Sequence, residues 1–222
     1  MSLKSTMSFE ISKINNYTYN LFIKDEQYRN ILYSSILPFF KHAFYNKIRS
    51  SIFITCAKIQ SLNDYLLEND KLLTYEQSLN IIHTLSIQIN FLYEKQCGFY
   101  GIDLEDIMVI DDDIFIICSD EKLLSIDSHD ENSQFLVIDK MIHIPFFHNP
   151  EILQIIELPA KINHKCIYYS LALLVMKCIF GKEIHDNEIS TTEAIKSIEY
   201  TKLYFFLKRC LDNLDDRCLL FV

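Results

Sequence analysis

Two regions of the chain have apolar residues spaced as they are in helices. Residues 74–95 have apolar side chains at three- and four-residue intervals, which predicts a long amphipathic helix with one buried face: Leu79, Ile82, Leu85, Ile89 and Leu92. Residues 166–180 (CIYYSLALLVMKCIF) are apolar on every face and are followed by Gly181. We expect a helix buried at the centre of a helical lobe, because this run is shorter than the roughly 20 residues of a membrane span.

Strand-like patterns occupy much of the first part of the chain. Residues 16–26 (NYTYNLFIKDE) alternate between apolar and polar positions, and residues 50–57 (SSIFITCA) form a short β-rich run. Between them, residues 27–47 have a helical pattern, with Pro38 as a break or kink. The pattern predicts a small lobe of mixed secondary structure over residues 1–57.

Pairs of capping side chains mark the beginning of the helical part. Ser61 is followed three residues later by Asp64, and Thr74 is followed three residues later by Gln77. In such a pair each side chain satisfies a backbone N–H group that the first helical turn leaves without a partner. The two pairs predict a short helix after Ser61 and a long helix that ends near Lys95.

The rest of the chain predicts a β-hairpin, a loop and two more helices. Apolar runs IMVI and IFIIC flank three aspartates, Asp111 to Asp113, which we expect to be solvated on an exposed turn. The polar stretch 119–134 predicts an exposed loop, and the last helices are expected over 191–198 and 201–213. The fold class is α+β, with a reduced N-terminal lobe of few strands and a mainly helical C-terminal lobe over 58–222.

Composition excludes several classes of protein. The chain has 222 residues, 50% of them apolar, with three glycines and four prolines, which favours a well-filled globule over disorder. A net charge of −9 without a basic run argues against nucleic acid or acidic membrane lipid as a partner. The seven cysteines form no CxxC pair, which is typical of buried free thiols in a reducing compartment. With no signal-peptide pattern, we expect a cytoplasmic protein.

The order of these elements resembles that of a protein kinase domain. A strand-bearing lobe is followed by two amphipathic helices, a loop, a hairpin, a long loop and a buried helix. Residues 91–121 resemble the kinase stretch that crosses the catalytic loop HRDLKPEN and a hairpin to reach DFG. A gapless match puts Gly101 at the Asp of HRD, Asp106 at the final Asn and Ser119 at the Asp of DFG.

Three later segments also resemble kinase motifs. FFHNPEIL (146–153) is similar to YxAPEvL, and the apolar run after Asn163 resembles the segment around the family's buried helix, with Ile167 in place of an Asp. FFLKRCLDNLDDR (205–217) resembles LxxxCLxxDPxxR. The resemblance covers roughly residues 50–220, with four motifs in the family's order.

The resemblance implies one structural ion pair. In the family, the glutamate of APE pairs with a late arginine and anchors the activation segment, and here Glu151 and Arg217 stand at these positions. Breaking a buried pair costs roughly 3–5 kcal/mol, so the presence of both residues predicts a formed contact. Arg217→Ala is then expected to destabilise the fold.

The groups that phosphoryl transfer requires are largely missing. It needs a carboxylate beside the acceptor hydroxyl, metal ligands, a lysine on the phosphates and a glycine-rich loop. Gly101 has no side chain, Asp103 replaces the loop lysine with a negative charge, and Ser119 is a poor metal ligand, whereas the Asp106 carboxylate is able to hold magnesium. No glycine precedes residue 98, so the glycine-rich loop is absent. Lys24 resembles the lysine of VAIK, but residues 27–47 contain no glutamate to pair with it. The alternative reading of Lys24 is a surface lysine at the end of a strand.

The resemblance therefore implies a pseudokinase that acts through protein contacts, without a cofactor, similar to divergent kinase-like proteins of large DNA viruses. Its place would be the host cytoplasm or the virion. One alternative is an active ATP- and magnesium-dependent kinase that uses Asp103, Asp106 and Asp120, which requires a shorter catalytic loop and a bulge in the hairpin. Another is a helical interaction protein unrelated to kinases. The run FFKHAFY (39–45) is a candidate contact surface, with core packing as the alternative.

Overall fold

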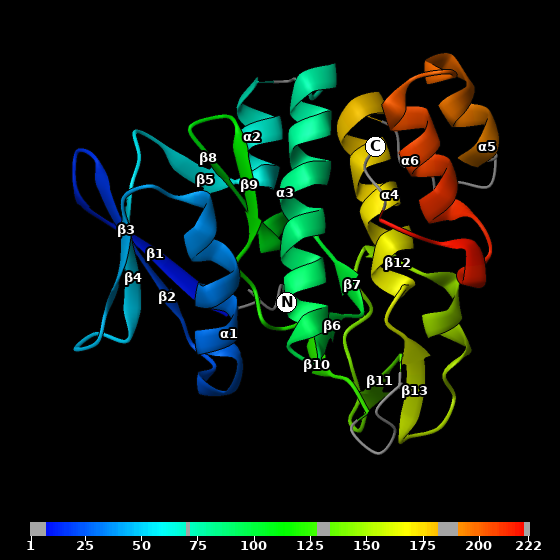
Figure 1. Cartoon of the computed structure of the whole chain (residues 1–222), viewed down its shortest axis with the longest axis horizontal. Helices are drawn as coiled ribbons and strands as arrows, with labels where there is room; N and C mark the ends of the chain where they lie inside the picture. The colour runs from blue at the N-terminus through cyan, green and yellow to red at the C-terminus, as the bar shows by residue number, and fades with distance from the viewer. Residues whose placement is uncertain (1–7, 70–71, 128–133, 182–190, 220–222) are drawn as a thin grey trace, which may run out of the picture.

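A computed structural model describes residues 8–69, 72–127, 134–181 and 191–219. The fold is α+β, with several small antiparallel sheets and helices of different lengths. Figure 1 shows a four-stranded sheet at one end, a long helix and the strands β5, β8 and β9 in the middle, and a group of helices at the other end.

The N-terminal sheet has the strand order β1-β2-β4-β3, and every neighbouring pair is antiparallel. Its strands are β1 (Phe9–Asn15), β2 (Thr18–Ile23), β3 (Ala43–Asn46) and β4 (Ser51–Thr55). Successive strand residues face opposite sides, so the fully buried Leu21, Ile23, Ile52 and Ile54 all face the same side. Helix α1 (Glu26–Ile36) lies between this side of the sheet and the long helix α3 (Figure 1).

The predicted helix over 27–47 is correct only in its first part. The helix ends at Ile36, a 3₁₀ turn over Leu37–Phe39 contains Pro38, and β3 pairs with β4 from Ala43 onward. Proline has no N–H to continue a helix, and the pairing with β4 then determines the strand. The strands predicted within 16–26 and 50–57 are confirmed.

The candidate contact run 39–45 divides between the core and the surface. Phe39 and Phe40 are partly buried against the core, whereas Phe44 is 60% exposed. The Phe44 ring stacks on that of Phe53 with a centroid distance of 5.1 Å.

The middle of the molecule consists of β5 (Ile59–Ser61), α2 (Leu62–Asn69) and α3 (Tyr75–Glu94). Both predicted capping pairs are confirmed. Asp64 N donates to Ser61 Oγ at 3.0 Å, and Thr74 and Gln77 form a reciprocal capping box at the start of α3.

The loop after α3 leads through short strands into the predicted hairpin. These strands are β6 (Cys97–Phe99), β7 (Gly101–Ile102), β8 (Ile107–Ile110), β9 (Ile114–Ile117) and β10 (Leu123–Ser125). The hairpin β8–β9 is confirmed and also pairs with β5, while β6 pairs with β10. The three aspartates of its turn are exposed as predicted, and Asp111 additionally accepts hydrogen bonds from Ala57 N and Lys58 N.

The predicted exposed loop over 119–134 is wrong in its first part. Ser119, Asp120 and Lys122 are only 4%, 6% and 5% exposed. Pairing of β10 with β6 carries this segment into the interior, where the Lys122 side chain has partners within the protein. Polarity therefore did not indicate exposure here. Residues 128–133 of the predicted loop lie outside the described residues.

The C-terminal part surrounds a buried helix, α4 (Cys166–Phe180), which ends as predicted at Gly181 with a φ of 68°. Helix α4 packs against α3, α6, β7 and β12. The other elements here are β11 (Phe135–Ile138), β12 (Phe147–His148), β13 (Ala160–Asn163), α5 (Thr191–Ala194) and α6 (Lys202–Leu211). All seven cysteines are free thiols, and six of them are buried, as predicted. Among the described residues, every helix is too short or too polar to cross a membrane.

Candidate functional site

The segment that resembles a catalytic loop lies between β6 and β8 and has no room for a side chain at Gly101. This residue is in β7, opposite His148 of β12. A Cβ atom built on Gly101 would lie 2.5 Å from Cγ of Pro145 and 3.1 Å from the backbone oxygen of Phe147. The position that the resemblance gives to the catalytic base is therefore filled by Pro145.

Two aspartates of this loop share a buried lysine. Lys122 Nζ lies 2.7 Å from Asp106 Oδ2 and 3.0 Å from Asp103 Oδ2. The side chains of Lys122, Asp106 and Asp103 are 7%, 8% and 19% exposed. Lys122 comes from the turn before β10, and the pairing of β10 with β6 brings it to the loop.

Backbone groups hold the same two carboxylates in place. Phe146 N donates to Asp103 Oδ1 at 2.5 Å, and Asp103 N donates to Asp106 Oδ2 at 2.7 Å. The backbone of Asp106 also accepts from Cys118 N, which ties the loop to the end of the hairpin. The carboxylates are thus fixed by hydrogen bonds that do not involve Lys122.

The electrostatics of this group favour a charged lysine. Burial by itself lowers the pKa of Lys122, but Asp106 and Asp103 outweigh burial, and the net effect is a pKa above the ordinary lysine value. Burial raises the pKa of the neighbouring Tyr100 to about 12, and its hydroxyl donates to the His143 backbone oxygen. At physiological pH Lys122 is therefore an ammonium and Tyr100 a neutral phenol.

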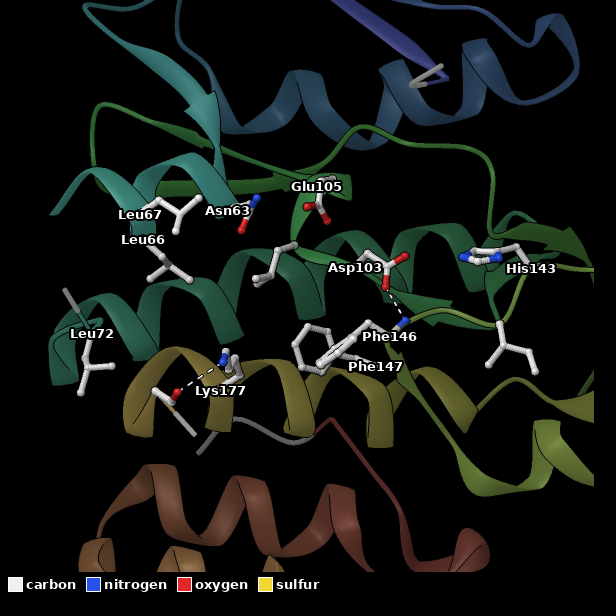
Figure 2. A pocket seen from close by; sticks show the side chains of 13 residues that line it. Asn63, Leu66, Leu67, Leu72, Asp103, Glu105, His143, Phe146, Phe147 and Lys177 are labelled. Carbon is white, nitrogen blue, oxygen red and sulfur yellow. Dashed lines mark hydrogen bonds between the residues drawn. The ribbon is translucent and has the colours of Figure 1, made fainter. Parts of the chain in front are cut away.

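Asp103 also borders a cavity of about 710 Å³, which Figure 2 shows. The cavity is bounded by α2, by the loop 143–147 and by the C-terminal end of α4. Its lining includes large apolar side chains that are well exposed, namely Leu67 at 71%, Leu72 at 52% and Phe146 at 47%. The exposed carboxylate of Glu105 and the amine of Lys177 are its other charged groups besides Asp103.

Asp120 and Lys24 line a different cavity, of about 520 Å³, between the N-terminus of α1 and the segment around β10. Burial raises the pKa of Asp120, whose Oδ2 atom is buried without a hydrogen-bond partner. In the part of the chain that the structure describes, no three His, Cys, Asp or Glu side chains form a group that could hold a metal ion. The cluster of Asp103, Asp106 and Asp120 that an active kinase would require is therefore not formed as a metal site.

Lys24 lies just after the end of β2, whereas the VAIK lysine stands within a strand, so its place agrees with the alternative of a surface lysine at the end of a strand. Lys24 Nζ lies 3.3 Å from Glu10 Oε1, on β1, and its side chain is 40% exposed. Arg29 of α1 contacts this region, and its guanidinium donates to the backbone oxygens of Ile23 and Lys24 at 2.6 and 2.7 Å. Arg29 thereby anchors α1 to the end of β2.

Glu151 and Arg217 lie within ion-pair distance, at 3.9 Å between Oε1 and Nη1. The stronger contacts of the buried Arg217 are with other groups. Its Nε donates to the Asp212 backbone oxygen at 2.9 Å, and its guanidinium lies over the Tyr169 ring at 4.9 Å. The predicted contact is present, but Arg217 depends as much on these neighbours as on Glu151.

Sequence reasoning missed Lys122, the residue that determines the chemistry of the loop. One signal was available. Lys122 is a single cation directly after Asp120 and Glu121, and the kinase resemblance brings this segment close to the loop that carries the other acids. Reading 119–134 as an exposed loop concealed it.

Comparison with models of known protein families gives no match, and comparison with curated proteins gives none either. What the chain does therefore has to follow from its site, because a fold by itself does not specify a function.

Proposed function

We propose that this protein is a kinase-like pseudoenzyme that acts by binding another protein. The observation that carries the proposal is the ion-pair network of the loop: both candidate acids, Asp103 and Asp106, are occupied by Lys122, and Gly101 has no space for a base.

The order of elements supports the kinase likeness. A strand-bearing lobe precedes the helix pair α2 and α3, and a loop, the hairpin β8–β9, a long segment and the buried helix α4 follow in that order. The alternative of an unrelated helical protein would have been favoured if the hairpin were missing, but the hairpin is present. The ion-pair contact between Glu151 and Arg217 adds a second point of likeness.

The local chemistry argues against phosphoryl transfer. A general base must be free to accept a proton from the acceptor hydroxyl. Asp103 has one carboxylate oxygen 3.0 Å from the Lys122 ammonium, and the other accepts a hydrogen bond from Phe146 N, so both oxygens are already engaged by groups of the protein itself. Lys24, the other group that ATP would need, pairs with Glu10.

Among the described residues, the 710 Å³ cavity is the strongest candidate for a protein-binding surface. Exposed apolar side chains around a groove are typical of interaction sites. Leu67, Leu72 and Phe146 are exposed here, and all three line the open cavity. The backbone and side chains of a docked segment would fill that space.

A melting experiment with nucleotide tests the absence of phosphotransfer chemistry. The purified chain is heated with 5 mM ATP, with and without 10 mM Mg²⁺, and is incubated in parallel with labelled ATP and a panel of acceptor proteins. We expect no change in melting temperature and no transferred phosphate. A magnesium-dependent rise that disappears in Asp106→Ala would instead favour the active kinase.

A second experiment tests the interaction. A displayed library of short peptides is selected on the parent chain, and the selected peptides are measured against Leu67→Asp and Leu72→Asp. Leu153→Asp is the matched control, because Leu153 is also exposed, at 57%, but does not line the cavity. We expect at least a tenfold loss of affinity in the two cavity variants and none in the control. Equal affinity in all variants would place the interaction elsewhere.

A further inference from the structure

Lys122 stands where a metal ion could stand. We propose that its ε-ammonium fills a latent divalent-cation site between Asp103 and Asp106, so that the parent chain takes up no metal and a neutral residue at position 122 creates a metal site. The inference rests on the proposed function and deepens it, because it names the group that keeps metal ions away from Asp103 and Asp106.

The geometry of the two carboxylates supports this inference. Each presents one oxygen to the same point, at 3.0 Å for Asp103 and 2.7 Å for Asp106. Their orientation is maintained by Phe146 N and Asp103 N, both of which are backbone groups. Removal of the lysine side chain therefore leaves two carboxylates that still converge, held by the fold itself.

The charge of the group supports the same conclusion. Two carboxylates and one ammonium carry a formal charge of −1, and without the ammonium the charge is −2 in a largely buried place. A divalent cation neutralises that charge, and hard cations such as Mg²⁺, Mn²⁺ and Ca²⁺ take carboxylate oxygens as ligands.

Two carboxylates are enough for such a site if water supplies the remaining ligands. Mg²⁺ commonly keeps several waters and binds proteins through one or two carboxylates. Asp103 is the one of the two carboxylates that lines the 710 Å³ cavity, so we expect the ion and its waters to enter from the Asp103 side.

We expect the parent chain not to bind a metal ion here, because the Lys122 ammonium is covalently part of the chain and already occupies the position. A divalent ion would have to displace a buried ammonium that lies within 3.0 Å of both carboxylates, and the displaced charge would stay near the incoming ion. Lys122 is therefore the residue that keeps a metal ion from binding between Asp103 and Asp106.

The test compares Lys122→Met with the parent. Mn²⁺ binding is measured by electron paramagnetic resonance, and melting temperature is measured with 0–10 mM Mn²⁺, Mg²⁺ or Ca²⁺. For a site of about millimolar affinity we expect a rise of about 3–6 °C at 10 mM in Lys122→Met, and no change in the parent. The double variant Lys122→Met/Asp106→Asn should lose both the bound Mn²⁺ and the rise. Lys58→Met is the matched control, because Lys58 pairs with Glu68 on the surface.

The failure of this inference is distinguishable from failure of the proposed function. A folded Lys122→Met that binds no cation overturns the latent site but leaves the pseudoenzyme intact, whereas magnesium-dependent ATP binding by the parent overturns the pseudoenzyme. If Lys122→Met does not fold without metal, refolding with 10 mM cation is expected to recover it. If neither this variant nor Lys122→Gln gains stability from any of the three cations, the inference is wrong.

Discussion

Gln88 joins three elements in the middle of the molecule, and its removal gives the sharpest stability prediction. Its side chain is fully buried on α3. Nε2 donates to the Ile117 backbone oxygen at 2.8 Å and to Ser35 Oγ of α1 at 3.0 Å, while Oε1 accepts from Ile117 N at 2.8 Å. The amide thus satisfies both backbone groups at the end of β9.

The cost of removing this amide follows from the groups left behind. In Gln88→Met the volume of the side chain is nearly conserved, so little cavity is created. The N–H and C=O of Ile117 are left without partners in a residue that is 1% exposed. Each buried unpaired group costs about 1–3 kcal/mol and two are left, so we expect Gln88→Met to lower the free energy of unfolding by about 2–6 kcal/mol. Gln88→Glu should also destabilise, because a carboxylate accepts from Ile117 N but cannot donate to its oxygen.

The assay is equilibrium unfolding in urea, followed by circular dichroism and fitted for both the midpoint and the slope. Asn90→Met is the matched control, because Asn90 is an exposed amide on the same helix. It should change the free energy of unfolding by less than about 0.5 kcal/mol. A loss below about 1 kcal/mol in Gln88→Met, with an unchanged slope, would refute the reasoning.

Three further changes test other parts of the fold. Arg217→Ala should lower the free energy of unfolding by about 2–4 kcal/mol in urea, because it removes a buried guanidinium and leaves Glu151 without its partner; a melt identical to the parent's would contradict the C-terminal part of the kinase likeness. Gly101→Ala should lower the same free energy by about 1–3 kcal/mol, because the new methyl group would meet the Pro145 ring at 2.5 Å, and a neutral result would show that Pro145 moves freely. Burial lowers the pKa of His164, so the unfolded chain binds the proton more readily; stability should be intact above about pH 6.5 and fall by at most about 1.4 kcal/mol per unit below it. Urea unfolding at pH 7.5, 6.5 and 5.5 would reveal this fall, and His164→Gln should remove that part of it.

Much of the local structure was predictable because it depends on neighbouring residues. The capping pair of Thr74 and Gln77 acts within one turn, and the apolar run that ends at Gly181 gives a buried helix in any environment that can enclose it. The helix expected to run to residue 47 failed at Pro38, because the strand that follows depends on pairing with β4.

The candidate site was predictable only in part. The sequence placed Asp103 and Asp106 on one loop, and a three-residue spacing on a short turn keeps them close. It did not place Lys122, which is 16 residues from Asp106 and reaches it through the pairing of β10 with β6. Asp120 was grouped with the loop acids by order along the chain, but it lines another cavity.

The sequence by itself determined the long helix α3, the buried helix α4, the capping side chains at Ser61 and Thr74, the hairpin, and the absence of glycine before residue 98, since each depends on residue type and short-range spacing. Only the tertiary structure decided that Lys122 neutralises the loop acids, that Pro145 fills the space beside Gly101, and that Gln88 completes β9. These contacts join segments far apart in the chain, and charge and hydrogen-bond energies depend on distance in space, which residue order alone does not give.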